Sequence, residues 1–113
     1  ASNEQPVLYE DVEEMVVVEE TLIKEFTVHS SNFGLEPSLI KVKKGETVRI
    51  NFFDDEGTHD FVIDEFNVRT NRISSGSSES VTFVADQEGT FAFYCSVLGH
   101  RALGMEGQLI VEP

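Results

Sequence analysis

The chain has 113 residues, of which 21 are acidic and 8 are basic, so its formal net charge at neutral pH is −13. This balance excludes nucleic-acid binding by a basic surface, because such a surface must neutralise phosphates. The length is that of one domain, and no apolar run approaches the roughly 20 residues that a membrane-spanning helix needs. The negative field favours a basic partner, although solubility in salty surroundings explains the charge equally well.

Residues 1–20 hold seven of the acidic residues and form the first unit. We expect residues 1–14 to be a flexible acidic lead-in, and the apolar run Met15–Val18 favours an edge strand. Tether, edge strand and oligomer contact are all open roles for this unit. The chain begins with Ala1, as it would after removal of an export signal, although a trimmed sequence looks the same. We therefore expect an exported protein, periplasmic or otherwise extracytoplasmic, with a removed N-terminal anchor as an option.

Residues 21–113 form the second unit, in which short apolar stretches alternate with turns rich in Gly, Ser and Asp. Hydrophobic side chains recur at every second position of most stretches, as half-buried strands require. The predicted strand positions are Phe26 and Val28, Ile40 and Val42, Val48, Ile50 and Phe52, Phe61–Ile63, Val81, Phe83 and Ala85, Phe91, Phe93 and Cys95, and Gln108–Val111. Helical periodicity is limited to one turn near Asp64–Val68. The pattern predicts an all-β fold, a two-sheet β-sandwich or barrel.

One loop near the C-terminus carries three donors for a soft metal ion. Cys95, His100 and Met105 follow one another at intervals of five residues, and His59 offers a second imidazole upstream. Two histidines and a cysteine in a plane, with a weak axial methionine, form the ligand set of a blue-type copper site. Taken singly, these residues would be a buried cysteine, a surface histidine and a core methionine. Their joint spacing favours the metal site.

Strand parity predicts how these donors face. Cys95 shares parity with Phe93, and His59 shares parity with Phe61, so both donors are expected to point inward at one end of the sandwich. His100 follows a glycine in the loop beyond the strand, and we expect it to reach the surface.

Two further polar features are expected to be structurally ordinary. His29, the third histidine, is predicted to be an exposed strand-end residue, so a second copper centre with three histidines lacks its ligands in this chain. The run Asp54–Glu56 lacks the spacing of a calcium loop. We expect it to be a solvated turn.

From about Phe26 to Val111 the sequence resembles the cupredoxins, small blue copper proteins such as plastocyanin, azurin and auracyanin. The segments that carry the resemblance are Tyr94–Ser96, Gly99–His100, Gly104–Gly107 and His59–Ile63. The resemblance implies a Greek-key β-sandwich. It also implies that His59, Cys95 and His100 are equatorial copper ligands and that Met105 is the axial ligand. The Cys-x4-His-x4-Met spacing looks closest to auracyanin-like members.

The sequence departs from the family at two places. The family usually has asparagine after the first histidine, where this chain has Asp60. The Asp60 carboxylate either accepts a hydrogen bond from Ser96, placing negative charge near the thiolate, or faces solvent, and both alternatives are open. Val97 and Leu98 stand where a proline is common, which leaves the loop less constrained and weakens the expected contact of Met105 with copper.

These features predict a one-electron carrier that holds one copper ion and exchanges electrons with redox proteins through His100. By analogy with the family, Leu98, Ala102 and Leu103 form the docking patch, with ordinary loop packing as the alternative, and the partner offers a basic docking surface. The main alternative is a copper protein with an open or water-bound axial site that reacts with a small ligand such as nitric oxide. A copper chaperone or a zinc site is a third hypothesis, although a thioether is a poor zinc ligand.

Overall fold

The computed structural model describes residues 23–113, so the acidic extension 1–20 and the predicted Met15–Val18 strand lie outside the described residues. The described part consists of eleven strands and two 3-10 helices. In chain order these are β1 (Ile23–Ser31), β2 (Gly34–Glu36), β3 (Leu39–Lys43), β4 (Thr47–Asp54), β5 (Thr58–His59), β6 (Val62–Ile63), η1 (Asp64–Phe66), β7 (Val68–Arg69), β8 (Ile73–Ser74), β9 (Ser78–Val84), β10 (Gly89–Tyr94), η2 (Arg101–Leu103) and β11 (Glu106–Glu112). None of the helices between residues 23 and 113 has the length and apolarity to cross a membrane.

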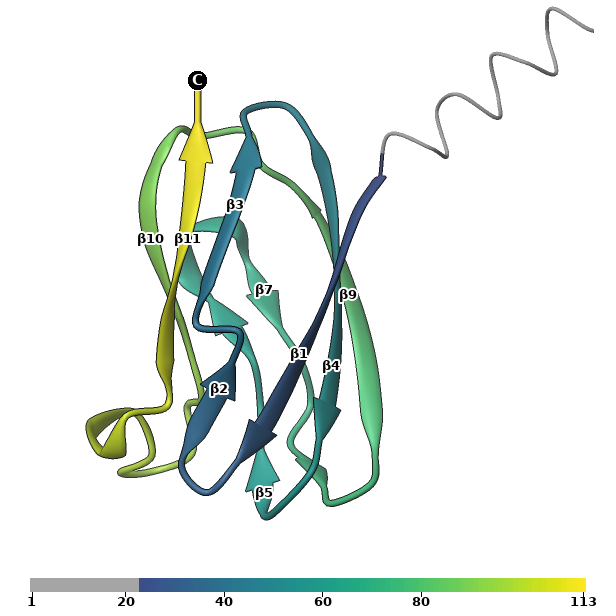
Figure 1. Cartoon of the computed structure of the whole chain (residues 1–113), viewed down its shortest axis with the longest axis vertical. Helices are drawn as coiled ribbons and strands as arrows, with labels where there is room; N and C mark the ends of the chain where they lie inside the picture. Colours follow the sequence, from purple (N-terminus) through teal and green to yellow (C-terminus); the bar gives the residue numbers. More distant parts are fainter. Residues whose placement is uncertain (1–22) are drawn as a thin grey trace, which may run out of the picture.

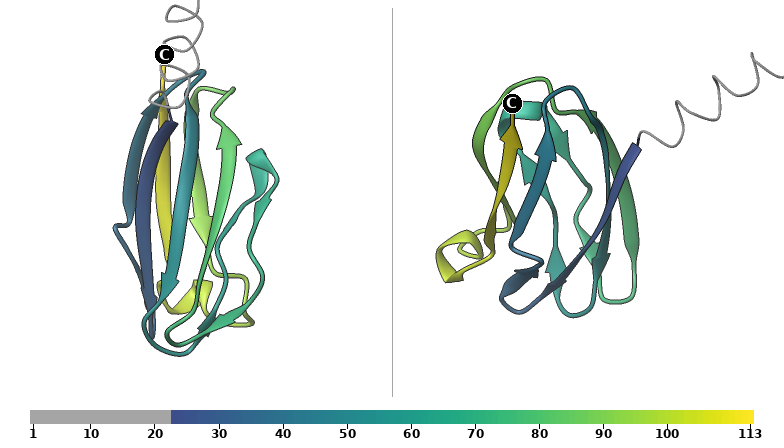
Figure 2. Two further views of the ribbon diagram at one scale, coloured as in Figure 1. Left: turned by 90° about the vertical axis from the view of Figure 1, so that its right-hand side faces the viewer. Right: turned by 45° about the horizontal axis from the view of Figure 1, so that its top comes forward.

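Two sheets pack face to face, which confirms the predicted all-β sandwich (Figures 1 and 2). The first sheet has the strand order β2-β1-β4-β9 and the second has the order β3-β11-β10-β6-β7. Two pairs, β1 with β4 and β3 with β11, are parallel, and the other neighbours are antiparallel. The short strands β5 and β8 pair separately. The predicted apolar stretches coincide with strands to within a residue or two, and the predicted helical turn is η1.

The core lies between the sheets and follows from the alternation in the sequence. Along β4 the side chains of Val48, Ile50 and Phe52 are fully buried, while the intervening ones are partly exposed. The ring of Phe61 lies 5.8 Å from that of Phe52 and 5.1 Å from that of Phe93, so three phenylalanines fill the centre. Burying each such side chain stabilises the fold by about 1.5–3 kcal/mol.

The segment His59–Ile63 is not one continuous strand, as the parity argument for His59 assumes. Thr58 and His59 pair with β8, whereas Val62 and Ile63 pair with β7, and Val62 also pairs with β10. All five residues from His59 to Ile63 are buried. The inward orientation of His59 is therefore correct, but the parity argument for it is wrong, because alternation needs one face in water.

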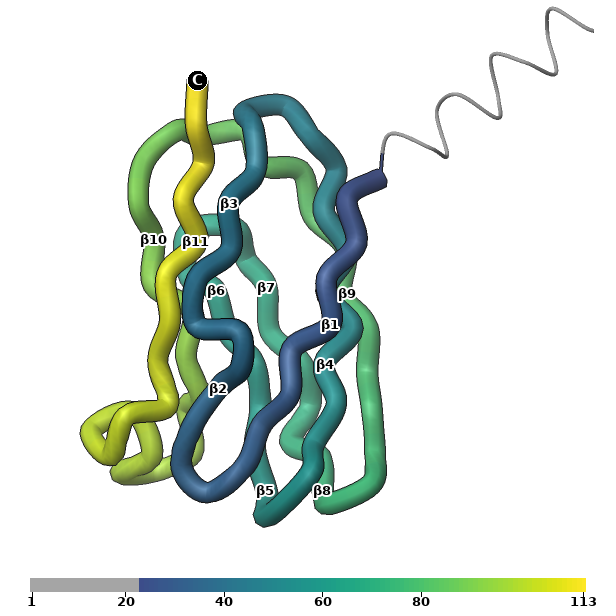
Figure 3. The backbone as a smooth tube through the Cα atoms, viewed as in Figure 1, coloured from purple at the N-terminus to yellow at the C-terminus, as the bar shows by residue number. Residues whose placement is uncertain are grey.

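The candidate site residues gather at one end of the sandwich. The last residues of β1 and β4, strand β5 and the loop that contains η2 all lie at the end opposite to the start of β1 and the C-terminus (Figures 1 and 3). Segments far apart in the sequence therefore meet at this end.

Candidate metal centre

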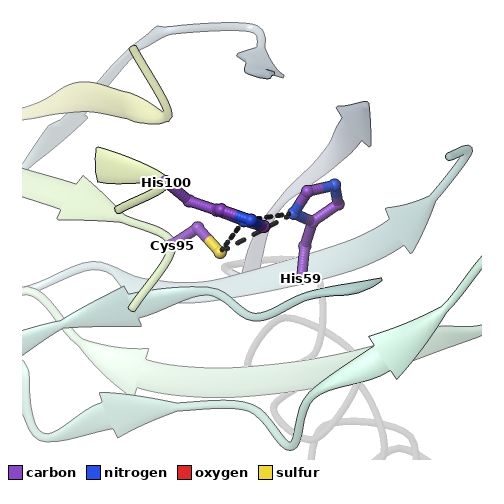
Figure 4. Close-up of side chains that lie close together, drawn as sticks. All are labelled: His59, Cys95 and His100. Atoms are coloured by element: carbon purple, nitrogen blue, oxygen red, sulfur yellow. Dashed lines mark hydrogen bonds between the residues drawn. The ribbon is translucent and has the colours of Figure 1, made fainter. Parts of the chain in front are cut away.

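Three side chains from separate segments bring their donor atoms together at this end (Figure 4). His59 ends β5, Cys95 directly follows β10, and His100 directly precedes η2. The two Nδ1 atoms of His59 and His100 are 3.1 Å apart. The Sγ atom of Cys95 lies 3.8 Å from Nδ1 of His59 and 3.7 Å from Nδ1 of His100. Among residues 23–113 this is the one cluster of at least three such donors within 4.8 Å of one another.

The triangle formed by these donor atoms has the size that a single metal ion needs. For sides of 3.1, 3.7 and 3.8 Å, the point equidistant from the three atoms lies about 2.1 Å from each. Metal–nitrogen and metal–sulfur bonds in such sites measure about 2.0–2.3 Å. The three side chains could thus hold one ion without rearranging.

The cluster is sealed from water on all but one side. Cys95 and His59 are fully buried, and His100 is partly exposed. Burial raises the pKa of the Cys95 thiol above its usual value, while hydrogen bonds from the backbone N–H groups of Asp60 and Val97 act in the opposite direction. A bound cation would overcome the effect of burial, because a thiol that coordinates a metal is deprotonated.

Backbone hydrogen bonds close the loop that carries the donors. The N–H of Cys95 donates to the carbonyl of Met105 at 3.2 Å, and the N–H of Met105 donates to the carbonyl of His100 at 3.2 Å. Gly104 ends η2 with φ of 114°, a conformation that favours glycine. The Met105 side chain is fully buried within the hydrophobic core cluster that also contains Cys95. The third predicted donor of the loop therefore lies inside the protein.

Asp60 faces inward rather than into solvent, which decides between the two orientations considered for it. Its side chain is 2% exposed, and its Oδ1 accepts a hydrogen bond from the backbone N–H of Ser96 at 2.6 Å. Its Oδ2 accepts a second bond from the hydroxyl of Ser96. The backbone N–H of Asp60 also points at Sγ of Cys95, at 3.5 Å. A carboxylate and an N–H group therefore lie beside the sulfur.

Comparison with known proteins identifies the family. Residues 16–111 match the cupredoxin-like domain. This chain belongs to the cupredoxins. The family resemblance predicted from the sequence is therefore confirmed, as is the fold that it implies.

Similar proteins are found both by sequence and by structure. The cupredoxin chain is 38% identical over 85 residues to nitrous-oxide reductase of Stutzerimonas stutzeri and 33% identical over 87 residues to halocyanin of Natronomonas pharaonis. These matches cover 72% and 74% of the chain, but only 13% of the reductase and 51% of halocyanin. Reduced auracyanin of Roseiflexus castenholzii superposes with a TM-score of 0.74 at 23% identity, covering 80% of this chain and 98% of auracyanin, which shows a shared fold.

Two arginines flank the buried carboxylate of this cupredoxin. Nη1 of Arg69 and Nε of Arg72 lie 3.8 Å and 3.9 Å from Oδ2 of Asp60, and both side chains are more than half exposed. Nη1 of Arg69 also donates a hydrogen bond to the Ser96 hydroxyl at 3.1 Å. The positive charges of the two arginines offset part of the free-energy cost of burying the Asp60 carboxylate. Because both arginines are exposed, solvent weakens this attraction.

The loop between β1 and β2 supplies two residues that the sequence analysis did not single out. Oδ1 of Asn32 lies 3.0 Å from Nε2 of His59, and the Phe33 ring packs edge-on against the His100 ring at 5.0 Å. The sequence offered no signal for either residue, because both belong to a short turn with no motif and lie far from His59 and His100 in the chain.

Four exposed apolar residues neighbour the partly exposed His100, three of them in the chain and Phe33 through its ring contact. Leu98 is 96% exposed, Leu103 is 60% exposed, Phe33 is 44% exposed, and Ala102 is exposed as well. We call these four residues the apolar rim. The predicted docking residues Leu98, Ala102 and Leu103 are therefore available at the surface.

His29 and Asp54 were both predicted to be exposed to solvent, and only His29 is. His29 is half exposed, and its Nδ1 lies 3.0 Å from Asp55, so it is a surface residue as predicted. Asp54, expected in a solvated turn, is fully buried instead. Its Oδ1 accepts hydrogen bonds from the Ser30 hydroxyl and from the backbone N–H of Glu56, so the carboxylate shapes the turn from within.

Proposed function

We propose that this cupredoxin binds one copper ion through His59, Cys95 and His100, with Met105 as a weak axial ligand, and carries single electrons between redox proteins. The observation that supports this most is the donor triangle, two Nδ1 atoms and one Sγ with sides of 3.1–3.8 Å. Bound copper supplies a one-electron couple, Cu(II)/Cu(I), and the chain supplies the donors, the geometry and the exclusion of water.

The donor types favour copper over zinc. Structural zinc sites take four ligands from cysteine, histidine and carboxylates, whereas a thioether is a soft donor that suits copper(I). Backbone hydrogen bonds hold Met105 next to Cys95 and His100, and its side chain is buried, so the proposal takes its sulfur as the fourth donor. With the Met105 sulfur as fourth donor, the axial position is not open to a small ligand such as nitric oxide, which separates this proposal from the alternative.

A one-electron carrier works best when its ligands move little between the two oxidation states. Three features of the chain oppose movement: Cys95 and Met105 belong to the hydrophobic core, backbone hydrogen bonds of Met105 close the loop, and Asp60 ties the His59 segment to the Cys95 segment. Close-packed interiors resist deformation.

Electrons enter and leave through His100, in this proposal, because it is the one donor of the triangle with exposed surface. The predicted patch Leu98, Ala102 and Leu103, extended by Phe33, would exclude water around that point when a partner docks. The net charge of −13 favours a redox partner with a basic surface. The proposal includes the predicted exported location, where ligation keeps the lone thiol from oxidation.

Metal analysis combined with electron paramagnetic resonance and visible spectroscopy tests the proposed function. We expect one copper per chain, an intense visible band from thiolate-to-copper charge transfer, and a narrow copper hyperfine splitting. A nearly colourless copper(II) form, or zinc in the native protein, contradicts the proposal. A visible spectrum that changes on addition of nitric oxide would instead favour the small-ligand alternative.

A further inference from the structure

The buried histidine of the candidate site has a specific partner on its second ring nitrogen. Nδ1 of His59 faces Cys95 and His100, while Nε2 lies 3.0 Å from Oδ1 of Asn32. An imidazole that donates from Nε2 is left with its lone pair on Nδ1, the atom that faces the metal position. The hydrogen bond made by one nitrogen therefore decides whether the other can bind a cation.

We propose that Asn32 is the positioning residue of the metal centre: its side-chain carbonyl accepts the Nε2 proton of His59 and presents Nδ1 to the metal. This inference rests on the proposed function, because it assigns His59 as a ligand. It also concerns the metal-free chain, since Asn32 holds the ring and its tautomer before any ion arrives.

The turn before His59 is built to leave room for this contact. Gly57 has φ of 87°, and a Cβ atom placed on it would lie 2.4 Å from Oδ1 of Asn32 and 2.8 Å from Nε2 of His59. Any larger side chain at this position would push the two groups apart, besides straining the backbone. The contact between Asn32 and His59 therefore depends on glycine at position 57.

A chain of hydrogen bonds holds Asn32 itself in place. Its backbone N–H donates to Oε1 of Glu56 at 3.0 Å, and the backbone N–H of Glu56 donates to the buried Asp54 carboxylate at 3.1 Å. The Ser30 hydroxyl donates to the same Asp54 oxygen at 3.0 Å. Because β1 and β4 pair in parallel with Ser30 opposite Asp54, the ends of both strands are fixed together. Asn32 therefore approaches His59 from an anchored backbone, although its own side chain is exposed.

The variant Asn32→Leu removes the acceptor and keeps the shape of the side chain. We expect its copper(I) affinity, measured by competition with a chelator, to fall by about tenfold, the lower end of the range for partners of metal ligands. We also expect the Nε2 proton of His59, followed by NMR in the diamagnetic copper(I) protein, to exchange with water faster. Asn32→Asp keeps an oxygen acceptor and should keep that proton protected. Ser31→Ala is the matched control, at an exposed neighbouring position.

Unchanged affinity and unchanged proton exchange in Asn32→Leu overturn the proposal. If Asn32→Leu does not fold, Asn32→Ala removes the same acceptor and is judged by the same two measurements. The proton measurement can also be made on the metal-free protein. If wild-type protein fails to bind copper, the proposed function fails, while faster exchange in metal-free Asn32→Leu still shows that Asn32 holds the His59 ring and its tautomer, and unchanged exchange there overturns that role.

Discussion

The carboxylate of Asp60 accepts two hydrogen bonds from Ser96, one from the backbone N–H and one from the hydroxyl. Asp60 directly follows His59, and Ser96 directly follows Cys95, so this contact joins the two segments that carry the buried donors. The contact also places a carboxylate within the site, where the dielectric constant is lower than in water. Both the geometry and the electrostatics of the candidate centre therefore depend on the contact between Asp60 and Ser96.

Asp60→Asn is expected to raise the reduction potential of the copper form. Removing a negative charge destabilises the more positive, oxidised state. The two arginines reduce the effect, and we expect about 1 kcal/mol, which for a one-electron couple is about 40 mV. Asparagine can still accept the backbone bond from Ser96, so the fold should persist. Voltammetry measures the shift, and Asp86→Asn, an equal charge change in the exposed turn after β9, is the control. A potential that moves equally in both variants would refute a local effect of Asp60.

Replacing Arg69 and Arg72 together by glutamine should shift the potential in the opposite direction. With both positive charges gone, the Asp60 carboxylate stabilises the oxidised state more strongly, so the potential falls. Since both arginines are more than half exposed, we expect at most about 1 kcal/mol and a smaller shift in high salt. Arg49→Gln, a partly exposed arginine that pairs with Glu25, should leave the potential unchanged. A salt-independent shift would contradict this explanation.

Met105→Leu tests the axial ligand while leaving the core filled. The two side chains have similar volumes, so the free energy of unfolding of the metal-free protein should fall by less than about 1.5 kcal/mol. If the thioether binds copper, its loss should raise the reduction potential and change the visible and paramagnetic resonance spectra, because the axial ligand tunes this type of site. Spectra and potential identical to those of the wild type would show that Met105 is a core residue only.

Leu98→Lys tests the apolar rim. The side chain is 96% exposed, so stability and spectrum should stay within experimental error of the wild type. A charge at the rim should leave a desolvated lysine in the docked complex, and we expect electron transfer to a protein partner to slow by about tenfold, which corresponds to about 1.4 kcal/mol. Stopped-flow kinetics measures the rate. Val84→Lys places the same charge on an exposed residue at the opposite end of the sandwich, and an equal slowing there would indicate a general charge effect instead.

The local parts of the site were predictable from the sequence. Cys95, His100 and Met105 lie on one loop, and their spacing alone keeps them near one another whatever the rest of the chain does. The strands were predictable for the same kind of reason, because alternation of Val48, Ile50 and Phe52 reflects one face in the core and one towards water. His59 could be proposed as a donor from its type, but its inward orientation comes from a segment buried on all sides rather than from strand parity.

The remaining parts of the site depend on contacts between distant segments. Whether Asp60 faces Ser96 or solvent, whether Asp54 is buried, and which residue holds Nε2 of His59 are settled where β1, β4, β5 and the loop after β10 meet. Polar side chains in turns follow no periodicity, so their partners cannot be derived from spacing. The sequence by itself determined the longer strands and the placing of three candidate donors on one loop, because these depend on neighbours in the chain. Only the tertiary structure decided the groups that surround and orient those donors, because each hydrogen bond there depends on two backbones brought together by the fold.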